Sequence, residues 1–243
     1  MDLHQVEQQV LSHVKTSRQL LIAVLPQGSD WSNFGDLSSD SNAYLEVFDK
    51  LVPTFLAKGA TPGRVTASGH SGGGPTALEI AKQRSTDRTD VLLFDAINYV
   101  CKEKVPVIKD GKPVVDKDGT PKTECKDNIC VNGQLTKVRD WVRAKIDADI
   151  KSLPEKPADQ KTELQANGTR FRGFTSESLE SKDTCGYGFW YGQLKSDIET
   201  TIKKLTISED AKNQLRQNYQ VRAVPGPHER VMAHGSLEAA LAG

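Results

Sequence analysis

The feature that most constrains this fold is a run of glycines around one serine, between two apolar segments. Residues 64–68 (RVTAS) predict a strand, and residues 75–83 predict a helix with proline in its first turn. Between them stands Gly69-His70-Ser71-Gly72-Gly73-Gly74. Glycine is costly inside either kind of element, so four glycines at this junction indicate a very tight turn from strand to helix.

The glycine spacing fits a turn that lifts a serine above the edge of a sheet. In the pattern G-x-S-x-G, small residues two places before and after the serine let the strand and helix backbones approach closely. Gly69, Ser71 and Gly73 occupy these positions. The backbone N–H of Gly72, at the start of the helix, is then placed to stabilise a negative oxygen on whatever Ser71 attacks. The pattern therefore favours Ser71 as a nucleophile.

A phosphate-binding loop and a plain tight turn are the alternative interpretations. A P-loop requires a lysine after its last glycine, and no lysine follows Gly74. The dinucleotide pattern G-x-G-x-x-G is not matched either, because Ser71 stands at its third position. A helix N-terminus after glycines still suits an anion. Both alternatives remain open, and the nucleophile is the preferred interpretation.

Strands and helices alternate along the first half of the chain. Short apolar runs at 20–25 (LLIAVL) and 90–95 (DVLLFD) predict buried strands on either side of the strand at 64–68. This alternation predicts an α/β fold, a mostly parallel sheet with helices on both faces, in a single domain over residues 1–243. Further helices are expected at 2–16, 42–58, 134–152, 190–205 and 229–242, and further strands at 169–175 and 220–225.

Residues 101–133 interrupt this pattern. They contain two Asp-Gly pairs between β-prone pieces, which predicts an inserted hairpin, and its position directly after the third strand suggests a cap over the site. The stretch Asp116-Lys117-Asp118-Gly119 lacks the later ligands of a calcium loop, so it is interpreted as a turn. The four cysteines are Cys101, Cys125, Cys130 and Cys185. Two interpretations of them remain open: disulfides that brace the insertion, or free thiols in a reducing compartment.

These features resemble the α/β-hydrolase superfamily over residues 20–242. The resemblance rests on the elbow Gly69-His70-Ser71-Gly72-Gly73, on an acid after a later strand and on a histidine after the last strand. Residues 101–133 have no counterpart in the family pattern. The resemblance implies a serine nucleophile, an acid and a histidine base, in that order along the chain.

A serine hydroxyl is barely ionised at neutral pH and needs a base to accept its proton. Among the five histidines, His228 follows the last expected strand, so it should lie with Ser71 at the carboxyl end of the sheet. It is therefore the predicted base. The other four are expected ahead of the sheet, beneath the elbow or in the closing helix: His4, His13, His70 and His234.

The predicted acid is Asp95, which ends the strand after the elbow. Most of the superfamily places its acid one strand later, and the earlier place resembles pancreatic-type lipases. The alternatives at the later place are Glu177 and Glu180. The second donor to the oxyanion, beside the Gly72 N–H, is expected from Gln27 or Gly28, which follow the strand at 20–25.

The resemblance implies a serine hydrolase with a small-molecule or acyl substrate. The expected bond is a carboxylic ester or thioester, with an amide as a further option, cleaved through an acyl-enzyme on Ser71 without cofactor or metal. The alternative is a non-catalytic binding module on the same scaffold, because a fold does not fix a function.

Charge and hydropathy limit the kinds of molecule that we expect this protein to bind. Lys and Arg number 32, as do Asp and Glu, so the formal net charge is zero and no nucleic-acid partner is expected. The apolar run at 20–25 is too short to span a membrane. The polar N-terminus lacks the apolar core of a secretory signal, which makes a cytoplasmic location the default expectation. The sequence does not indicate an oligomeric state.

Overall fold

The structure of the chain is a computed structural model. It describes residues 46, 50, 52–56, 58, 63–83, 89–224 and 226–232. The first element within these ranges is a short 3₁₀ helix, η2, at Val52–Phe55. Several expected elements lie wholly or largely outside the described residues: the helices at 2–16, 42–58 and 229–242 and the strand at 20–25.

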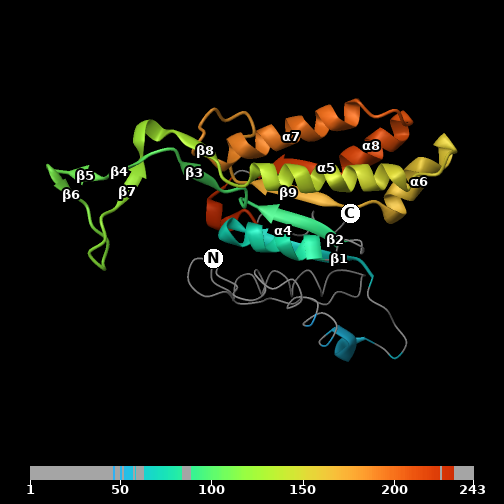
Figure 1. The fold of residues 1–243 in the computed structure, drawn as a ribbon, viewed down its shortest axis with the longest axis horizontal. Coiled ribbons are helices and arrows are strands. Elements are labelled where there is room, and N and C mark those ends of the chain that lie inside the picture. Colours follow the sequence, from blue (N-terminus) through green and yellow to red (C-terminus); the bar gives the residue numbers. More distant parts are fainter. Residues whose placement is uncertain are drawn as a thin grey trace.

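A four-stranded parallel sheet forms the centre of the described part of the chain (Figure 1). The neighbours follow the order β1, β2, β9, β10, and all three pairings are parallel. Both central strands are buried along their whole length, which explains the continuous apolar run Val91–Phe94 of β2. The strands are β1 Val65–His70, β2 Thr89–Phe94, β9 Phe171–Thr175 and β10 Tyr219–Ala223. Their carboxyl ends share one edge, where Ser71 and Asp95 follow β1 and β2.

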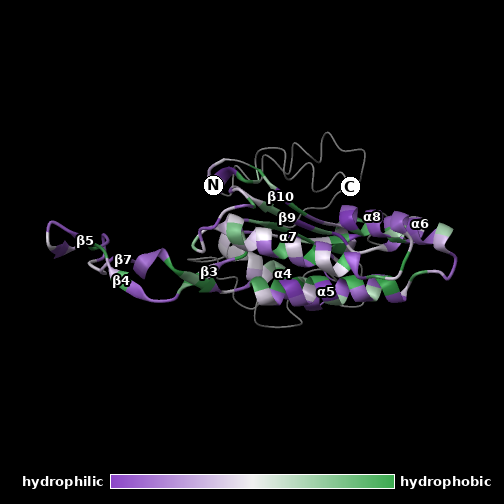
Figure 2. Cartoon of the chain, turned by 90° about the horizontal axis from the view of Figure 1, so that it is seen from above, coloured by the Kyte–Doolittle hydropathy of each residue, from purple (hydrophilic) through white to green (hydrophobic). Residues whose placement is uncertain are grey.

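Helices pack on this sheet and share one large hydrophobic cluster with it. Figure 2 shows α4, α5 and α7 lying on one side of β9 and β10. In α5, the buried Leu135, Val138, Trp141, Val142 and Ile146 recur at helical spacing, so one face is apolar. The described α-helices are α4 Gly74–Gln83, α5 Leu135–Lys151, α6 Pro157–Asn167, α7 Tyr187–Lys203 and α8 Glu209–Asn218.

A second, smaller cluster lies on the other side of β2. Val91 and Leu93 belong to the large cluster, whereas Leu92 and Phe94 belong to the small one, because successive side chains of a strand point to opposite faces. The remaining buried members of the small cluster are Phe174, Val231 and Met232. The last two residues follow the 3₁₀ helix η5, His228–Arg230, so the chain after β10 returns across the sheet.

The predicted α/β class is confirmed, and so are its described elements. The strands expected at 64–68, 90–95, 169–175 and 220–225 correspond to the four strands of the sheet, with shifts of one or two residues at their ends. The helix expected at 190–205 begins earlier, at Tyr187. Two helices were not expected: α6, which buries only Leu164, and α8, which buries the polar Gln214 and Asn218 beside two apolar residues. Neither helix has a clear apolar stripe.

The inserted residues form a hairpin arm, defined here as residues 99–132. Figures 1 and 2 both show it extending from the end of the sheet. Three short antiparallel pairs follow one another toward its tip: β3 Tyr99–Cys101 with β8 Cys130–Asn132, β4 Lys104–Pro106 with β7 Thr123–Cys125, and β5 Ile108–Lys109 with β6 Lys112–Pro113. A 3₁₀ helix, η4 Lys126–Asn128, lies between β7 and β8.

Both Asp-Gly signals are turns of the hairpin arm. Asp110 and Gly111 close the β5–β6 hairpin with positive φ angles of 50° and 73°, the backbone that favours Asp-Gly at this place. In the second turn Gly119 has a φ of 84°, and the Asp118 carboxylate accepts the Thr120 N–H. At the base of the arm the Tyr99 ring contacts the Tyr187 ring at the start of α7, and a capping role for the insertion stays a prediction.

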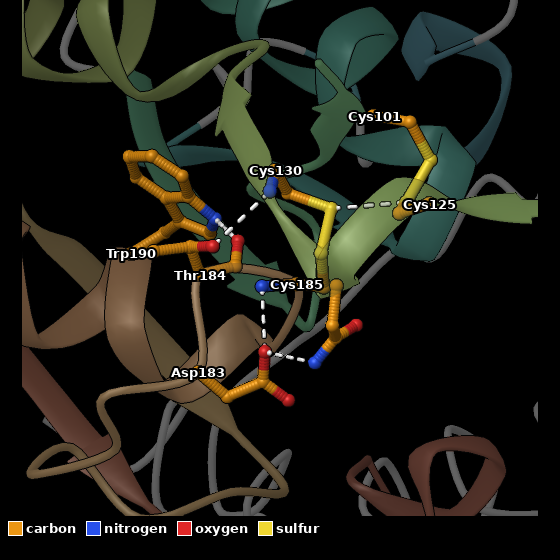
Figure 3. Close-up of a disulfide and its surroundings, with 8 residues drawn as sticks. Cys101, Cys125, Cys130, Asp183, Thr184, Cys185 and Trp190 are labelled. Carbon is orange, nitrogen blue, oxygen red and sulfur yellow. Dashed lines mark hydrogen bonds between the residues drawn. A yellow bond between two sulfur atoms is a disulfide. The ribbon is translucent and has the colours of Figure 1, made fainter. Parts of the chain in front are cut away.

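The four cysteines form two disulfides, Cys101–Cys125 and Cys130–Cys185 (Figure 3). The first lies within the hairpin arm, and the second joins β8 to the loop before α7. The two bridges are adjacent, with 3.2 Å between the sulfurs of Cys125 and Cys130. Disulfides persist in oxidising compartments, so this pairing fits a secreted protein rather than the cytoplasmic location expected by default.

Polar contacts strengthen the same junction. The Cys130 N–H donates to the Thr184 hydroxyl, and the Trp190 indole N–H donates to the Thr184 carbonyl oxygen (Figure 3). The arm is therefore fixed at its base to the segment that begins α7. Within the described ranges, no helix has both the length and the apolar character needed to cross a membrane.

Candidate active site

The turn after β1 has the strained geometry that its sequence predicts. Ser71 has a φ of 50°, a left-handed backbone that costs energy for a residue other than glycine. The chain then enters η3, Ser71–Gly73, and continues directly into α4. A Cβ atom on Gly69 would lie 2.5 Å from the Gly73 carbonyl oxygen, and one on Gly74 would lie 2.4 Å from that of Ala96. Glycine is required at both positions.

We expect Gly69→Ala to lower the free energy of unfolding by about 1–3 kcal/mol, because the methyl group meets backbone atoms that cannot move aside. Gly63→Ala is the matched control, since no heavy atom lies within 4 Å of its Cβ position. Urea denaturation of both variants measures the difference. Equal midpoints for the two variants would contradict the close packing at the elbow.

Asp95 is held at the end of β2 by contacts on every side. It is fully buried and has a φ of 43°. Its N–H donates to the Phe174 carbonyl oxygen at 2.8 Å, and its Oδ1 accepts the Ser176 N–H at 3.0 Å. Its Oδ2 lies 3.0 Å from Nδ1 of His228, 133 residues away in the sequence. The structure therefore brings the predicted acid and the predicted base together.

The contact with Asp95 defines the role of each nitrogen of His228. A carboxylate accepts hydrogen bonds, so Nδ1 carries the proton and Nε2 keeps the free electron pair that a general base needs. The side chain is 31 % exposed, so its outer edge is open to solvent. His228 is thus buried on the side of the acid and accessible on the other.

Two aromatic rings stack on His228. The His70 ring lies 4.7 Å away between centroids, and the Tyr187 ring lies 4.9 Å away at an interplanar angle of 2°. The His70 Nε2–H also donates to the His228 carbonyl oxygen at 2.9 Å. Burial lowers the pKa of His70, which favours its neutral form. His70, expected beneath the elbow, packs and hydrogen-bonds against the His228 segment.

Tyr187 packs on the predicted base: its ring stacks on that of His228. Burial raises the pKa of Tyr187, and the nearby charges of Asp95 and Glu177 raise it further, while the side chain of Ser71 is close enough to lower it. The phenol is therefore protonated at neutral pH. Tyr187, the first residue of α7, thus lies against the face of the predicted base.

The alternative acids have other surroundings than Asp95. The Glu177 carboxylate accepts the Gly188 N–H at 2.9 Å, which places it at the start of α7, and Glu180 is exposed. Gln27 and Gly28, the expected second oxyanion donors, lie outside the described residues, as do His4, His13 and His234. Gly72 lies in η3, at the start of the helix after Ser71.

Sequence reasoning missed Tyr187 because it placed the start of the helix three residues late, at 190. Gly186 is the N-cap of α7, and glycine is an accepted residue there, so the Gly-Tyr pair carried a weak signal of an earlier start. Asn98 was missed as well. Its side-chain amide donates to the Ser71 carbonyl oxygen at 3.4 Å, which links the loop after Asp95 to the elbow.

One group of metal-ligating atoms is close together among the described residues: the sulfurs of Cys101, Cys125 and Cys130. All three belong to disulfides and so present no thiolate to an ion. The chemistry available at the Ser71 edge is that of a hydroxyl, an imidazole and a carboxylate.

Comparison with known proteins found no match among family models, curated proteins or solved structures.

Proposed function

We propose that the protein is a serine hydrolase of the α/β-hydrolase type that cleaves carboxylic esters or thioesters. The observation that carries this proposal is the hydrogen bond between Asp95 and His228 at the sheet edge where Ser71 leaves its strained elbow. A carboxylate that orients an imidazole beside a serine is the arrangement that activates a serine nucleophile.

Each group has a role in this proposal. Ser71 attacks the carbonyl carbon, and its proton passes to Nε2 of His228. Asp95 keeps Nδ1 protonated and stabilises the imidazolium that forms. The Gly72 N–H, at the start of the helix, stabilises the negative oxygen of the tetrahedral intermediate. Loss of the alcohol or thiol leaves an acyl group on Ser71, and water then releases it by the same steps.

The fold supports this assignment. Ser71, Asp95 and His228 follow β1, β2 and β10 in the order nucleophile, acid, base. The carboxyl ends of parallel strands are where open α/β sheets bind ligands. The strained backbone of Ser71 supports it further, since serine rarely adopts a positive φ and such strain occurs at functional sites. The two disulfides fit an enzyme that works in an oxidising compartment, such as the extracellular space.

A fluorophosphonate probe tests the proposal. We expect the folded protein to be labelled once, and peptide mapping by mass spectrometry to locate the adduct on Ser71. Denatured protein is the control, since an unactivated serine does not react. The expected substrates are short aryl esters and acyl thioesters. A folded protein that neither reacts with the probe nor turns over any of these substrates would instead be a binding module.

A further inference from the structure

The proposed base lies on a short turn that has little structure of its own to fix it. η5 has three residues, and the Val231 N–H reaches the His228 carbonyl oxygen only at 3.4 Å. Within the described residues, two shorter hydrogen bonds join His228 to distant parts of the chain, one from Nδ1 to Asp95 and one at the carbonyl oxygen from His70. A catalytic side chain needs neighbours that lock its position. The position of His228 therefore depends on these two contacts as well as on the packing of the residues that follow it.

His70 contacts both the backbone and the ring of the base. Its Nε2–H donates to the His228 carbonyl oxygen at 2.9 Å, and the two rings lie 4.7 Å apart between centroids at an interplanar angle of 30°. We infer that His70 is a positioning residue that fixes the imidazole of His228 relative to the elbow. This inference rests on the proposed function and assigns a role to the first variable position of the pattern G-x-S-x-G.

The place of His70 in the chain makes this connection direct. It is the last residue of β1 and directly precedes Ser71. Its backbone is extended, with φ −110° and ψ 137°, so the strand sets the direction of its side chain. It pairs with Phe94 of β2, the residue before Asp95. The elbow and the acid thus leave two adjacent strands at the same level, and the residue between strand and elbow holds the base.

The protonation state of His70 suits this role. Burial lowers its pKa, and the neighbouring His228 lowers it further, against the effect of the hydrogen bond to the carbonyl oxygen. A neutral imidazole has one N–H, and here Nε2 carries it, because a carbonyl oxygen only accepts. When Ser71 attacks, an imidazolium forms on His228. A neutral aromatic ring stacked on this cation stabilises it, whereas a second cation would repel it.

Two substitutions separate the hydrogen bond of His70 from its ring. His70→Phe keeps an aromatic ring and removes the donor, so the His228 carbonyl oxygen loses its shorter hydrogen bond. We expect kcat for a short aryl ester to fall about tenfold to a hundredfold with KM nearly unchanged, because a shift of the base by about 1 Å has a cost of this order. His70→Gln keeps an uncharged N–H donor of similar reach, and it should retain most of the wild-type kcat.

Ser152→Ala is the matched control for the loss of one hydrogen bond. The Ser152 hydroxyl donates to the Asp149 carbonyl oxygen at 2.8 Å, and this contact is partly buried, as that of His70 is. It lies at the opposite edge of the sheet, where the Asp149 carboxylate accepts the Thr169 N–H ahead of β9. This variant should retain the wild-type kcat. Urea denaturation of all three variants separates a loss of kcat from a loss of folded protein.

The Nδ1 proton of His228 gives a readout that does not need turnover. Hydrogen-bonded to Asp95, it should give a downfield proton NMR signal that is absent from Asp95→Asn. In His70→Phe this signal should broaden, because a less firmly held ring exchanges the proton with water faster. In His70→Gln the signal should persist.

A wild-type kcat in His70→Phe would overturn the inference, as would a change confined to KM, an equal loss of kcat in His70→Gln, or an unchanged NMR signal in His70→Phe. Each of these results leaves the proposed function intact, because the wild-type protein is still labelled and still turns over its substrates. A wild-type protein without labelling or turnover would instead defeat the proposed function itself. The two failures are therefore distinct.

Discussion

Ser71→Ala is expected to lower kcat for a short aryl ester about a millionfold and to abolish fluorophosphonate labelling. The hydroxyl oxygen forms the bond of the acyl-enzyme, so no acyl-enzyme forms in its absence. The residual rate over water would come from the oxyanion donor at Gly72 and from substrate binding. Steady-state kinetics with an active-site titration measure the effect, and the titration guards against traces of wild-type enzyme.

Ser68→Ala is the matched control for this variant. Ser68 is an exposed residue of the same strand, three positions before the elbow, and its loss should leave turnover unchanged. Full activity in Ser71→Ala, or equal losses in the two variants, would rule out Ser71 as the nucleophile. In that case the strained turn would have to be explained by binding alone.

Asp95→Asn is expected to lower kcat by about ten thousandfold with little change in the fold. Asparagine accepts the left-handed backbone of Asp95 as readily as aspartate does. The Ser176 N–H fixes the amide oxygen at the place of Oδ1, so the amide nitrogen faces Nδ1 of His228. Two donors cannot share a hydrogen bond, and His228 must move its proton to Nε2. It then has no free electron pair for the Ser71 proton.

Glu177→Gln separates Asp95 from the alternative acid. The glutamine oxygen still accepts the Gly188 N–H, so α7 should keep its start and turnover should change far less than in Asp95→Asn. Kinetics for both variants over a range of pH decide between the two carboxylates. A larger loss in Glu177→Gln than in Asp95→Asn would transfer the role of the acid to Glu177.

The central part of the fold was predictable because its signals are local. The strand, the glycine turn and the helix around Ser71 are contiguous, and the apolar run of β2 is typical of a buried strand. Asp95 and His228 were predictable by position, since each follows a strand of the sheet. Their contact depends on the order of the strands, which the sequence pattern does not contain.

Features that depend on tertiary contacts could not be predicted in this way. Four cysteines allow three pairings, and only the folded arm brings Cys130 to Cys185. Tyr187 lies in an aromatic-rich stretch, YGFWYG, in which nothing distinguishes the ring that meets His228 from those that enter the core. The helix α6 contributes a single buried side chain, so its periodicity is hidden in the sequence.

The return of the chain after β10 has a consequence for how the proposed base is supported. Just beyond His228, Val231 and Met232 are anchored in the small cluster with Leu92, Phe94 and Phe174. Phe94 also directly precedes Asp95, and its ring stacks on Phe174 at 5.1 Å. The same patch of apolar packing thus carries both ends of the acid–base hydrogen bond. The alignment of the Asp95–His228 hydrogen bond therefore depends on apolar side chains on the face of the sheet opposite the large cluster.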